Sequence, residues 1–235
     1  MKARTIFLLF LYVIIVLCLI PVLLVCMLFR MKEPLYAIAK GAMRLSQWVL
    51  GINLKIDGLD NIDATKSYVF MSNHLSFIDG PLLFMVIPHS VRIIFKKELF
   101  LIPVVAQTMT YVGFVPVDRK GVEAGKTSVK QAARLMREKG YSFLVFPEGT
   151  RSLDGELGKF RRGGFFLALE SAAPIAPISI RGTFELMPKG SFFVRKGTIR
   201  VLFHPPISIG GVDESRMGGL METVRTAILD GLKEE

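Results

Sequence analysis

The sequence predicts an α/β fold with a mainly parallel central sheet flanked by helices, preceded by an N-terminal membrane-associated helical hairpin. Short apolar runs alternate with stretches of helical periodicity along residues 51–235, which is the order expected of strand–helix–strand units. The run at residues 142–146 (SFLVF) is almost continuously apolar, as is typical of a parallel strand buried on both faces. The hairpin is predicted because residues 6–29 contain no charged side chain.

The apolar stretch at residues 6–29 would form a helix of roughly 36 Å, which is long enough to cross a bilayer. A signal peptide fits less well, because the run is too long and no small-x-small cleavage site follows it. Residues 34–50 add an apolar helical stripe with Trp48 at a position typical of a membrane interface. We therefore expect residues 1–50 to be a two-helix membrane anchor that spans the bilayer or dips into one leaflet, and residues 51–235 to be an α/β domain.

The composition indicates a partner that carries negative charge. The formal net charge is +10, which suits anionic lipid head groups or an acidic substrate. No nucleic-acid-binding module is recognisable, so we expect no nucleic-acid partner. Cys18 and Cys26 both lie inside the apolar stretch, too far apart on a helix to form a disulfide. A domain on the cytosolic face of the cytoplasmic membrane fits this cysteine usage.

The predicted strands follow in order after residue 50. They occupy residues 52–56, 68–71, 91–95, 113–117, 142–146, 174–180 and 198–203. Pro116 marks the fourth run as an edge strand or an irregular segment, since proline cannot donate to a sheet ladder. The helices expected between and after these runs are one that ends at Gly140, a short one at 165–171 and an amphipathic one near 213–232.

Polar clusters stand directly after three of these runs. Residues 72–74 (SNH) follow the second run, Asp118 and Arg119 follow the fourth, and residues 147–151 (PEGTR) follow the fifth. Ligands of open α/β sheets bind outside the carboxyl ends of the strands. We therefore expect the three clusters to converge on one site if the strands are parallel neighbours.

The first cluster contains His74 with Asp79 five positions later. On a straight helix their side chains would lie about 140° apart and could not meet. They can meet if His74 ends the strand side of a turn and Asp79 caps or opens the next helix, for which Gly80 and Pro81 are a typical start. The carboxylate then holds one imidazole nitrogen and leaves the other free as a base. An ordinary helix cap beside a turn histidine is the alternative.

Other chemistries have less support in the sequence. Ser76 would be the nucleophile of a hydrolase, but it lies between the base and its orienting carboxylate, and no G-x-S-x-G elbow is present. His89 and His204 stand apart from any ligand cluster, so we expect no metal site. A base without a protein nucleophile implies that the nucleophile belongs to the substrate, and a hydroxyl is the natural candidate.

The segment at residues 146–151 (FPEGTR) is a candidate binding site for an anion or an alcohol. Gly149 lets the backbone approach a ligand, and Arg151 can bind a phosphate through two hydrogen bonds. A Glu–Arg pair that stabilises a loop is the alternative. Basic residues at 158–164 and at Lys96 and Lys97 either extend this site or form a solvated surface. The candidate binding residues of the segment itself are Glu148, Gly149, Thr150 and Arg151.

Taken together, these motifs resemble those of the glycerolipid acyltransferase family, in particular the 1-acylglycerol-3-phosphate (lysophosphatidate) acyltransferases. The matching segments are H-x4-D at 74–79, GFVPVDR at 113–119, FPEGTR at 146–151, PIAPI at 174–178 and a basic element at 96–99. Four motifs in the correct order are far more specific than any one of them. Pro116 stands where an aromatic residue is frequent and Leu75 where a polar one is, and both departures affect acceptor preference.

The resemblance implies the glycerolipid acyltransferase fold for residues 51–235. It implies transfer of a fatty acyl chain from an acyl-carrier-protein or coenzyme A thioester to the sn-2 hydroxyl of lysophosphatidate, giving phosphatidate in phospholipid biosynthesis. His74 would be the base and Asp79 its orienting partner. No metal and no bound cofactor are implied. The residues implied in substrate binding are Arg119, Glu148, Gly149, Thr150, Arg151, Lys96 and Lys97.

The partners implied are lysophosphatidate and other membrane lipids, the thioester donor and the membrane itself. Three alternatives remain open at this point. The first is an acyltransferase of the same family that acts on another lysolipid or on glycerol 3-phosphate. The second is a non-catalytic, membrane-bound lipid-binding protein, and the third is a lipid esterase.

Overall fold

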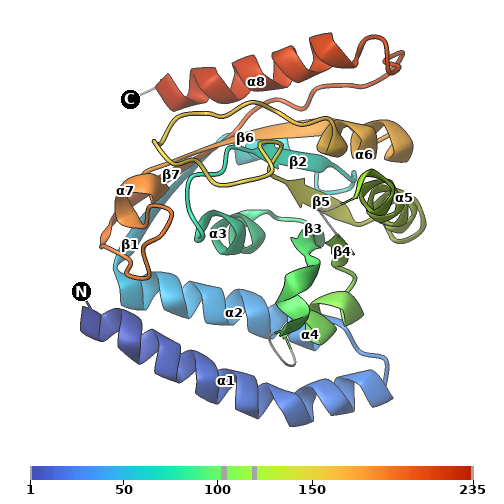
Figure 1. The fold of residues 1–235 in the computed structure, drawn as a ribbon. Helices are drawn as coiled ribbons and strands as arrows, with labels where there is room; N and C mark the ends of the chain where they lie inside the picture. Colours follow the sequence, from blue (N-terminus) through green and yellow to red (C-terminus); the bar gives the residue numbers. More distant parts are fainter. Residues whose placement is uncertain (1, 102–104, 118–120, 234–235) are drawn as a thin grey trace.

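A seven-stranded sheet lies between two layers of helices in the computed structural model, which describes residues 2–101, 105–117 and 121–233 (Figure 1). The strand order is β1-β7-β6-β2-β5-β3-β4, and only the β6–β7 pair is antiparallel. The predicted mainly parallel sheet is therefore confirmed. The strands are β1 (Ile52–Asp57), β2 (Val69–Ser72), β3 (Val91–Lys96), β4 (Val115–Val117), β5 (Ser142–Val145), β6 (Ile175–Arg181) and β7 (Gly197–Phe203).

Helices α2, α3 and α4 lie on one side of the sheet, with α1 outside them, and α5, α6 and α8 lie on the other (Figure 1). The short α7 follows β6. The helices are α1 (Lys2–Leu28), α2 (Glu33–Leu50), α3 (Asp79–Val86), α4 (Val105–Tyr111), α5 (Val122–Lys139), α6 (Gly163–Ser171), α7 (Thr183–Leu186) and α8 (Met217–Lys233), with 3₁₀ turns η1 (Leu59–Asn61) and η2 (Lys97–Leu101). Each predicted helix is present, with ends shifted by a few residues.

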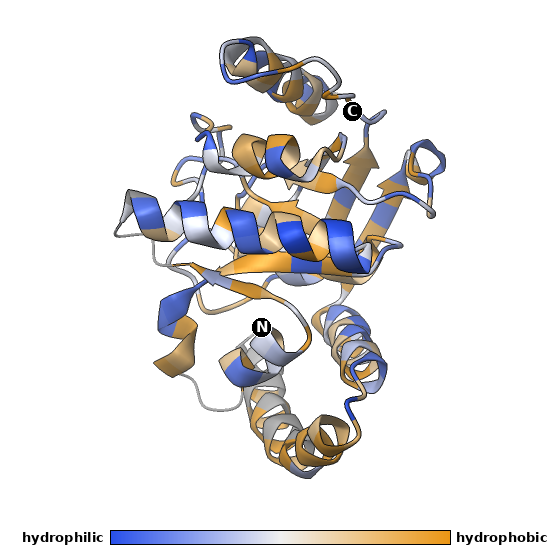
Figure 2. Cartoon of the chain, turned by 90° about the vertical axis from the view of Figure 1, so that its right-hand side faces the viewer, coloured by the Kyte–Doolittle hydropathy of each residue, from blue (hydrophilic) through white to orange (hydrophobic). Residues whose placement is uncertain are grey.

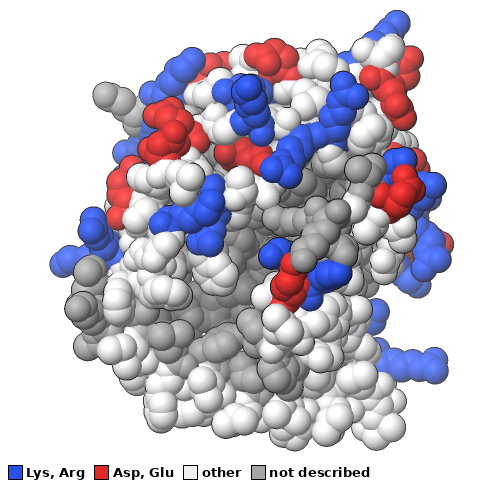
Figure 3. Space-filling view, viewed as in Figure 1, with Lys and Arg blue, Asp and Glu red and all other residues white. Residues whose placement is uncertain are grey.

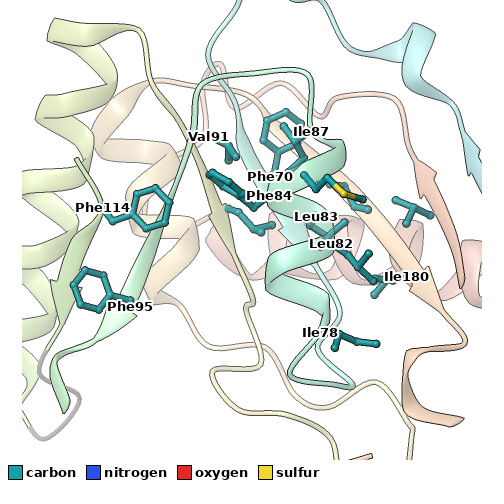
Figure 4. Packing of buried hydrophobic residues seen from close by; sticks show 14 of the residues in the cluster. Phe70, Ile78, Leu82, Leu83, Phe84, Ile87, Val91, Phe95, Phe114 and Ile180 are labelled. Atoms are coloured by element: carbon teal, nitrogen blue, oxygen red, sulfur yellow. The ribbon is translucent and has the colours of Figure 1, made fainter. Parts of the chain in front are cut away.

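The sheet separates two apolar cores, because alternate side chains of a strand point to opposite faces. In β2, Phe70 packs on the α3 side, whereas Val69 and Met71 pack on the side of α6 and α8. Apolar residues concentrate in the sheet and on the helix sides that face it (Figure 2). Figure 4 shows Leu82 and Leu83 of α3 packed near Phe70, and this packing holds the helix against the centre of the sheet.

The fourth predicted strand is an edge strand, as Pro116 indicated. β4 lies at the end of the sheet beside β3 and has only three residues. Asp118 and Arg119, which follow it in the sequence, lie outside the described residues. The structure therefore tests the expected convergence only for the clusters at residues 72–74 and 147–151.

The N-terminal helices α1 and α2 lie side by side as a hairpin (Figure 1). Many large apolar side chains of this hairpin are exposed, among them Phe10, Leu17, Leu24, Leu28 and Trp48. Across residues 2–101, 105–117 and 121–233, no helix carries an apolar stretch that is long enough to cross a membrane. Membrane association of the hairpin stays a prediction.

Helix α2 is also packed into the core of the sheet. Leu35 and Leu50 are buried in the same apolar cluster as Phe70. The hydroxyl of Tyr36 lies 3.1 Å from the carbonyl oxygens of both His89 and Val91. Burial, which disfavours the phenolate, raises the pKa of Tyr36 to about 12. The phenol is therefore protonated and can donate to either carbonyl.

The buried guanidinium of Arg92 lies between α2 and the sheet. Its carbon Cζ is 4.8 Å from the ring centre of Tyr36 and 3.9 Å from that of Tyr141. Its Nε donates to the carbonyl of Val112 at 2.6 Å. A cation desolvated between two aromatic rings is a favourable arrangement, and here it joins α2 to β3 and to the start of β5.

Candidate active site

The imidazole of His74 and the carboxylate of Asp79 are in contact. Nδ1 of His74 lies 2.9 Å from Oδ2 of Asp79. β2 ends at Ser72 and α3 begins at Asp79, so the turn between strand and helix brings the two side chains together. This is the arrangement expected from the five-residue spacing: Asp79 opens the helix, and Ile78 takes the capping position.

Asp79 is fixed by the turn that it closes. Its Oδ2 also accepts hydrogen bonds from the backbone N–H groups of Leu75 and Ser76, both at 2.7 Å. The side chain is completely buried at the N-terminus of α3, where the helix dipole favours a negative charge. An ionised Asp79 accepts the proton on Nδ1 of His74, which leaves Nε2 as the basic nitrogen. The His74 side chain is 20% exposed, so a substrate can reach it.

Phe146 forms a platform for the histidine. The two rings are stacked with centres 4.0 Å apart and planes 17° apart. The stacking limits rotation of the imidazole about its Cβ–Cγ bond and so keeps Nε2 pointed in one direction. Motif spacing does not predict this contact, because Phe146 closes an apolar run that is typical of the end of a strand.

Glu148 connects the histidine turn to the loop after β5. One carboxylate oxygen accepts the backbone N–H of His74 at 2.7 Å, and the other accepts the N–H of Gly158 at 2.8 Å. Only 5% of the residue is exposed, and this burial raises the pKa of the carboxyl, although the two N–H donors oppose the shift. Glu148 therefore holds His74 in place through the backbone. Its predicted contact with substrate stays a prediction.

Gly149 has a backbone φ of +72°, which favours glycine. A β-carbon at this position would lie 3.0 Å from Cδ of Arg161, so the glycine leaves room for a protein side chain. Thr150 and Arg151 are contacted by Lys189, whose Nζ lies 3.3 Å from the Thr150 hydroxyl and 3.3 Å from the Arg151 carbonyl. Lys189 adds a cation beside the predicted phosphate-binding residue. Lys189 lies far from Thr150 in the sequence, so no motif predicts this contact.

Lys96 and Lys97 stand at the same edge of the sheet but farther from the histidine. Lys96 ends β3 and Lys97 follows it, and β3 is separated from β2 by β5, so about 10 Å of sheet lies between them and the end of β2. Lys96 forms an ion pair with Glu98 at 3.2 Å. In the view of Figure 3, Lys and Arg side chains gather over the upper part of this face, while few charged groups appear on the described lower part, over α1 and α2.

Ser76 does not have the environment of a nucleophile. It is completely buried, and its hydroxyl donates to the carbonyl of Met187 at 2.7 Å. The other two histidines lie elsewhere. The ring of His89 contacts the rings of Tyr68 and Phe70, and Nε2 of His204 lies 2.8 Å from the hydroxyl of Ser179.

Comparison with known proteins places these features in context. A family model described as Acyltransferase matches residues 53–181, a span that contains His74, Asp79 and the loop after β5. The 1-acyl-sn-glycerol-3-phosphate acyltransferase of Limnanthes douglasii is 38% identical over 161 residues, which are 68% of this chain and 57% of that protein. The enzyme of the same description from Saccharomyces cerevisiae is 30% identical, over 83% of this chain and 68% of that protein.

The alignments with the first plant relatives span 44% to 57% of the length of those proteins. Among solved structures, the crystal structure of the 1-acyl-sn-glycerophosphate (LPA) acyltransferase PlsC from Thermotoga maritima superposes with a TM-score of 0.83. The superposition covers 100% of this chain and 97% of that chain at 23% sequence identity. At this identity the likeness establishes the fold.

Proposed function

This chain belongs to the Acyltransferase family, and we propose that it transfers a fatty acyl chain to the sn-2 hydroxyl of 1-acylglycerol-3-phosphate, giving phosphatidate. The observation that carries the proposal is the buried Asp79 that holds a partly exposed His74, within a family of acyl-transferring enzymes. The donor is a thioester of acyl carrier protein or coenzyme A, which acts as a co-substrate. The reaction written this way needs no metal and no bound cofactor.

In this mechanism Nε2 of His74 takes the proton from the acceptor hydroxyl as its oxygen attacks the thioester carbonyl. The carbon–oxygen bond of the new ester forms, the carbon–sulfur bond breaks, and the departing thiolate takes the proton back from the imidazolium. Asp79 stabilises that imidazolium through the contact with Nδ1. Positioned general-base catalysis of this kind contributes roughly 10²- to 10⁴-fold to a rate.

Thiol release from long-chain acyl donors, followed with and without lysophosphatidate, tests the proposal. We expect release only with the acceptor present, together with one phosphatidate for each thiol. Release without acceptor, accompanied by free fatty acid, would identify an esterase. Binding of lipid without any release would identify a lipid-binding protein. Faster release with glycerol 3-phosphate or another lysolipid would change the acceptor but keep the reaction class.

Arg151 is proposed to bind the acceptor phosphate. Arg151→Ala should reduce kcat/KM for lysophosphatidate by roughly 10- to 100-fold, since a charge-assisted pair of hydrogen bonds is lost. Activity with an uncharged monoacylglycerol should change much less. The matched control is Arg134→Ala on the surface of α5, which removes an exposed arginine paired with Glu138. An equal loss with both acceptors would assign Arg151 a structural role.

Gly158 is expected to matter because of its distance from Glu148. A β-carbon at Gly158 would lie 2.8 Å from Oε2 of Glu148 and would displace the carboxylate that holds the His74 backbone. Gly158→Ala should therefore lower kcat by about 10- to 100-fold, because small misplacements of a catalytic group are costly. Gly163→Ala is the control, since a β-carbon there meets nothing within 4 Å. Unchanged kcat in Gly158→Ala would show that Glu148 does not position His74.

The site is further proposed to work at the cytosolic face of the cytoplasmic membrane, with α1 and α2 as the anchor. The exposed apolar side chains of the hairpin support this proposal. A soluble catalyst would have to extract a long-chain acceptor from lipid at a cost of about 0.8 kcal/mol per methylene. An anchored site avoids that extraction, because the acyl chain of the acceptor stays in the bilayer during the reaction.

A further inference from the structure

Three loops lie at the His74 turn and are joined to one another by hydrogen bonds. They are residues 74–78, residues 149–158 and residues 187–193, and we name them the active-site rim. The N–H of Ser152 donates to the carbonyl of His74 at 2.8 Å, and the hydroxyl of Ser76 donates to the carbonyl of Met187 at 2.7 Å. Lys189 joins the third loop to the second through its contact with the Thr150 hydroxyl. The rim is therefore one connected set of loops that includes the His74 turn.

Each loop of the rim presents one large apolar side chain to the outside. Phe77 is 62% exposed, Leu153 is 77% exposed and Phe192 is 80% exposed. Single exposed apolar residues are ordinary on protein surfaces. Here, however, they occur on all three loops around one site, which is the pattern of an interaction surface.

The two longer loops hold these side chains outward with ordered turns. Ser191 bonds to both the N–H and the carbonyl of Phe193, which leaves Phe192 at the tip. The hydroxyl of Ser152 bonds to Asp154 and accepts the N–H of Gly155, which leaves Leu153 at the tip in the same way. The apolar side chains are thus presented by fixed backbone.

Basic residues occur in the two longer loops of the rim and in the residues next to them in the sequence. In residues 149–162 and 184–196, the surface cations outnumber the surface carboxylates. The cations are Arg151, Lys159, Arg161, Arg162, Lys189, Arg195 and Lys196, and the carboxylates are Asp154, Glu156 and Glu185. Apolar tips among cations fit a surface with negative charges above an apolar interior, which describes a bilayer with anionic head groups.

We propose that the active-site rim is a second membrane contact, separate from the hairpin of α1 and α2. Leu153 and Phe192, with Phe77, enter the boundary between head groups and acyl chains, while the basic side chains lie among the lipid phosphates. His74 then faces the head-group layer from inside the ring of contacts. This inference rests on the proposed function for its purpose, namely delivery of a membrane-embedded acceptor to His74, but its physical test does not depend on turnover.

The direct test uses tryptophan fluorescence in full-length protein reconstituted into anionic vesicles. Trp48 is the only tryptophan, so a Trp48→Phe background allows single reporters at Leu153→Trp and at Phe192→Trp. Lipids with brominated acyl chains should quench both reporters. A matched reporter, Thr226→Trp on the exposed side of α8, should not be quenched, because α8 covers the opposite side of the sheet from α1 and α2 (Figure 1).

The functional test uses the double variant Leu153→Ser/Phe192→Ser. Turnover of long-chain lysophosphatidate in vesicles should fall at least tenfold, while turnover of a short-chain, water-soluble analogue should stay within about twofold of the parent protein. The conservative double variant Leu153→Met/Phe192→Leu should restore vesicle activity. Phe77 is left unchanged because it adjoins the catalytic turn.

Unquenched reporters at both rim positions would overturn the inference, whatever the activity results. Equal losses on the two substrates would also overturn it, since they would assign the rim a structural role. Reporters that respond to an acidic carrier protein or to a second copy of this chain, but not to brominated lipid, would assign the surface to that partner instead. Quenched reporters in a protein that transfers no acyl group would keep the membrane contact and refute the proposed function.

Discussion

His74→Ala is expected to lower acyl transfer by roughly 10²- to 10⁴-fold, because the variant has no group that can take the proton from the acceptor hydroxyl. The loss should appear in kcat for thiol release, with little change in the affinity for lysophosphatidate. The stacking on Phe146 disappears as well, but the ring is partly exposed, so the melting temperature should change by only a few degrees.

The matched control for His74→Ala is His89→Phe. His89 lies among the aromatic rings of Tyr68 and Phe70, away from the catalytic turn, and a phenyl ring fills a similar volume. This variant should retain nearly full activity. Near-normal turnover in His74→Ala would remove the base from the mechanism and with it the main support for acyl transfer to a hydroxyl.

Asp79→Asn is expected to reduce the rate by up to about 10⁴-fold, the scale known for the orienting carboxylate of a Ser-His-Asp triad. Oδ2 faces Nδ1 of His74 and two backbone N–H donors, so the amide oxygen would take its place, and the imidazolium formed in the reaction would lose its negatively charged partner. The backbone N–H groups of Leu75 and Ser76 would also lose a charged acceptor. We therefore expect a stability loss of about 1–3 kcal/mol, measured by thermal or denaturant unfolding.

The two effects of Asp79→Asn can be separated by comparing it with Ser76→Ala. That change removes the hydrogen bond from Ser76 to Met187, so it disturbs the same turn without touching the carboxylate. A rate loss that matches its stability loss, and no more, is expected for Ser76→Ala. If Asp79→Asn lost only tenfold or less, the shape of the turn would orient His74 and the charge of Asp79 would not be needed.

The strands and the contact between His74 and Asp79 could be predicted because both depend on short-range patterns. Buried parallel strands require continuous apolar runs, and the run at β5 shows this clearly. A five-residue spacing excludes a shared helix face and leaves a strand–turn–helix junction as the way to bring the pair together. The start of α3 at Asp79 satisfies that requirement.

The supports of the site could not be predicted, because they depend on how distant loops fold. The sequence predicts that Glu148 binds substrate, but it does not show that the two carboxylate oxygens accept backbone N–H groups from His74 and Gly158. A sequence shows the carboxylate but not the donors that will face it. The same applies to Lys189, which reaches Thr150 across a gap of 39 positions.

Helix α2, the second helix of the N-terminal hairpin, is joined to α3 and to the segment after it by hydrogen bonds. Nζ of Lys40 donates to the carbonyl of Ile87 at the C-terminal end of α3, and Tyr36 bonds to the segment that follows it. Asp79 forms the opposite end of α3. With the hairpin proposed to lie in lipid, this arrangement acts as a rigid strut.

In the proposed membrane-anchored state, a rigid connection would set the height of His74 above the bilayer, whereas a flexible tether would let the domain move over a range of heights. The fixed distance of the catalytic nitrogen from the bilayer would then limit which hydroxyl groups it can reach. Acceptors whose hydroxyl lies at that height are within reach, and those with the hydroxyl carried farther out on a larger head group are not. Discrimination among lipids can therefore arise from position alone, before any side chain reads the head group.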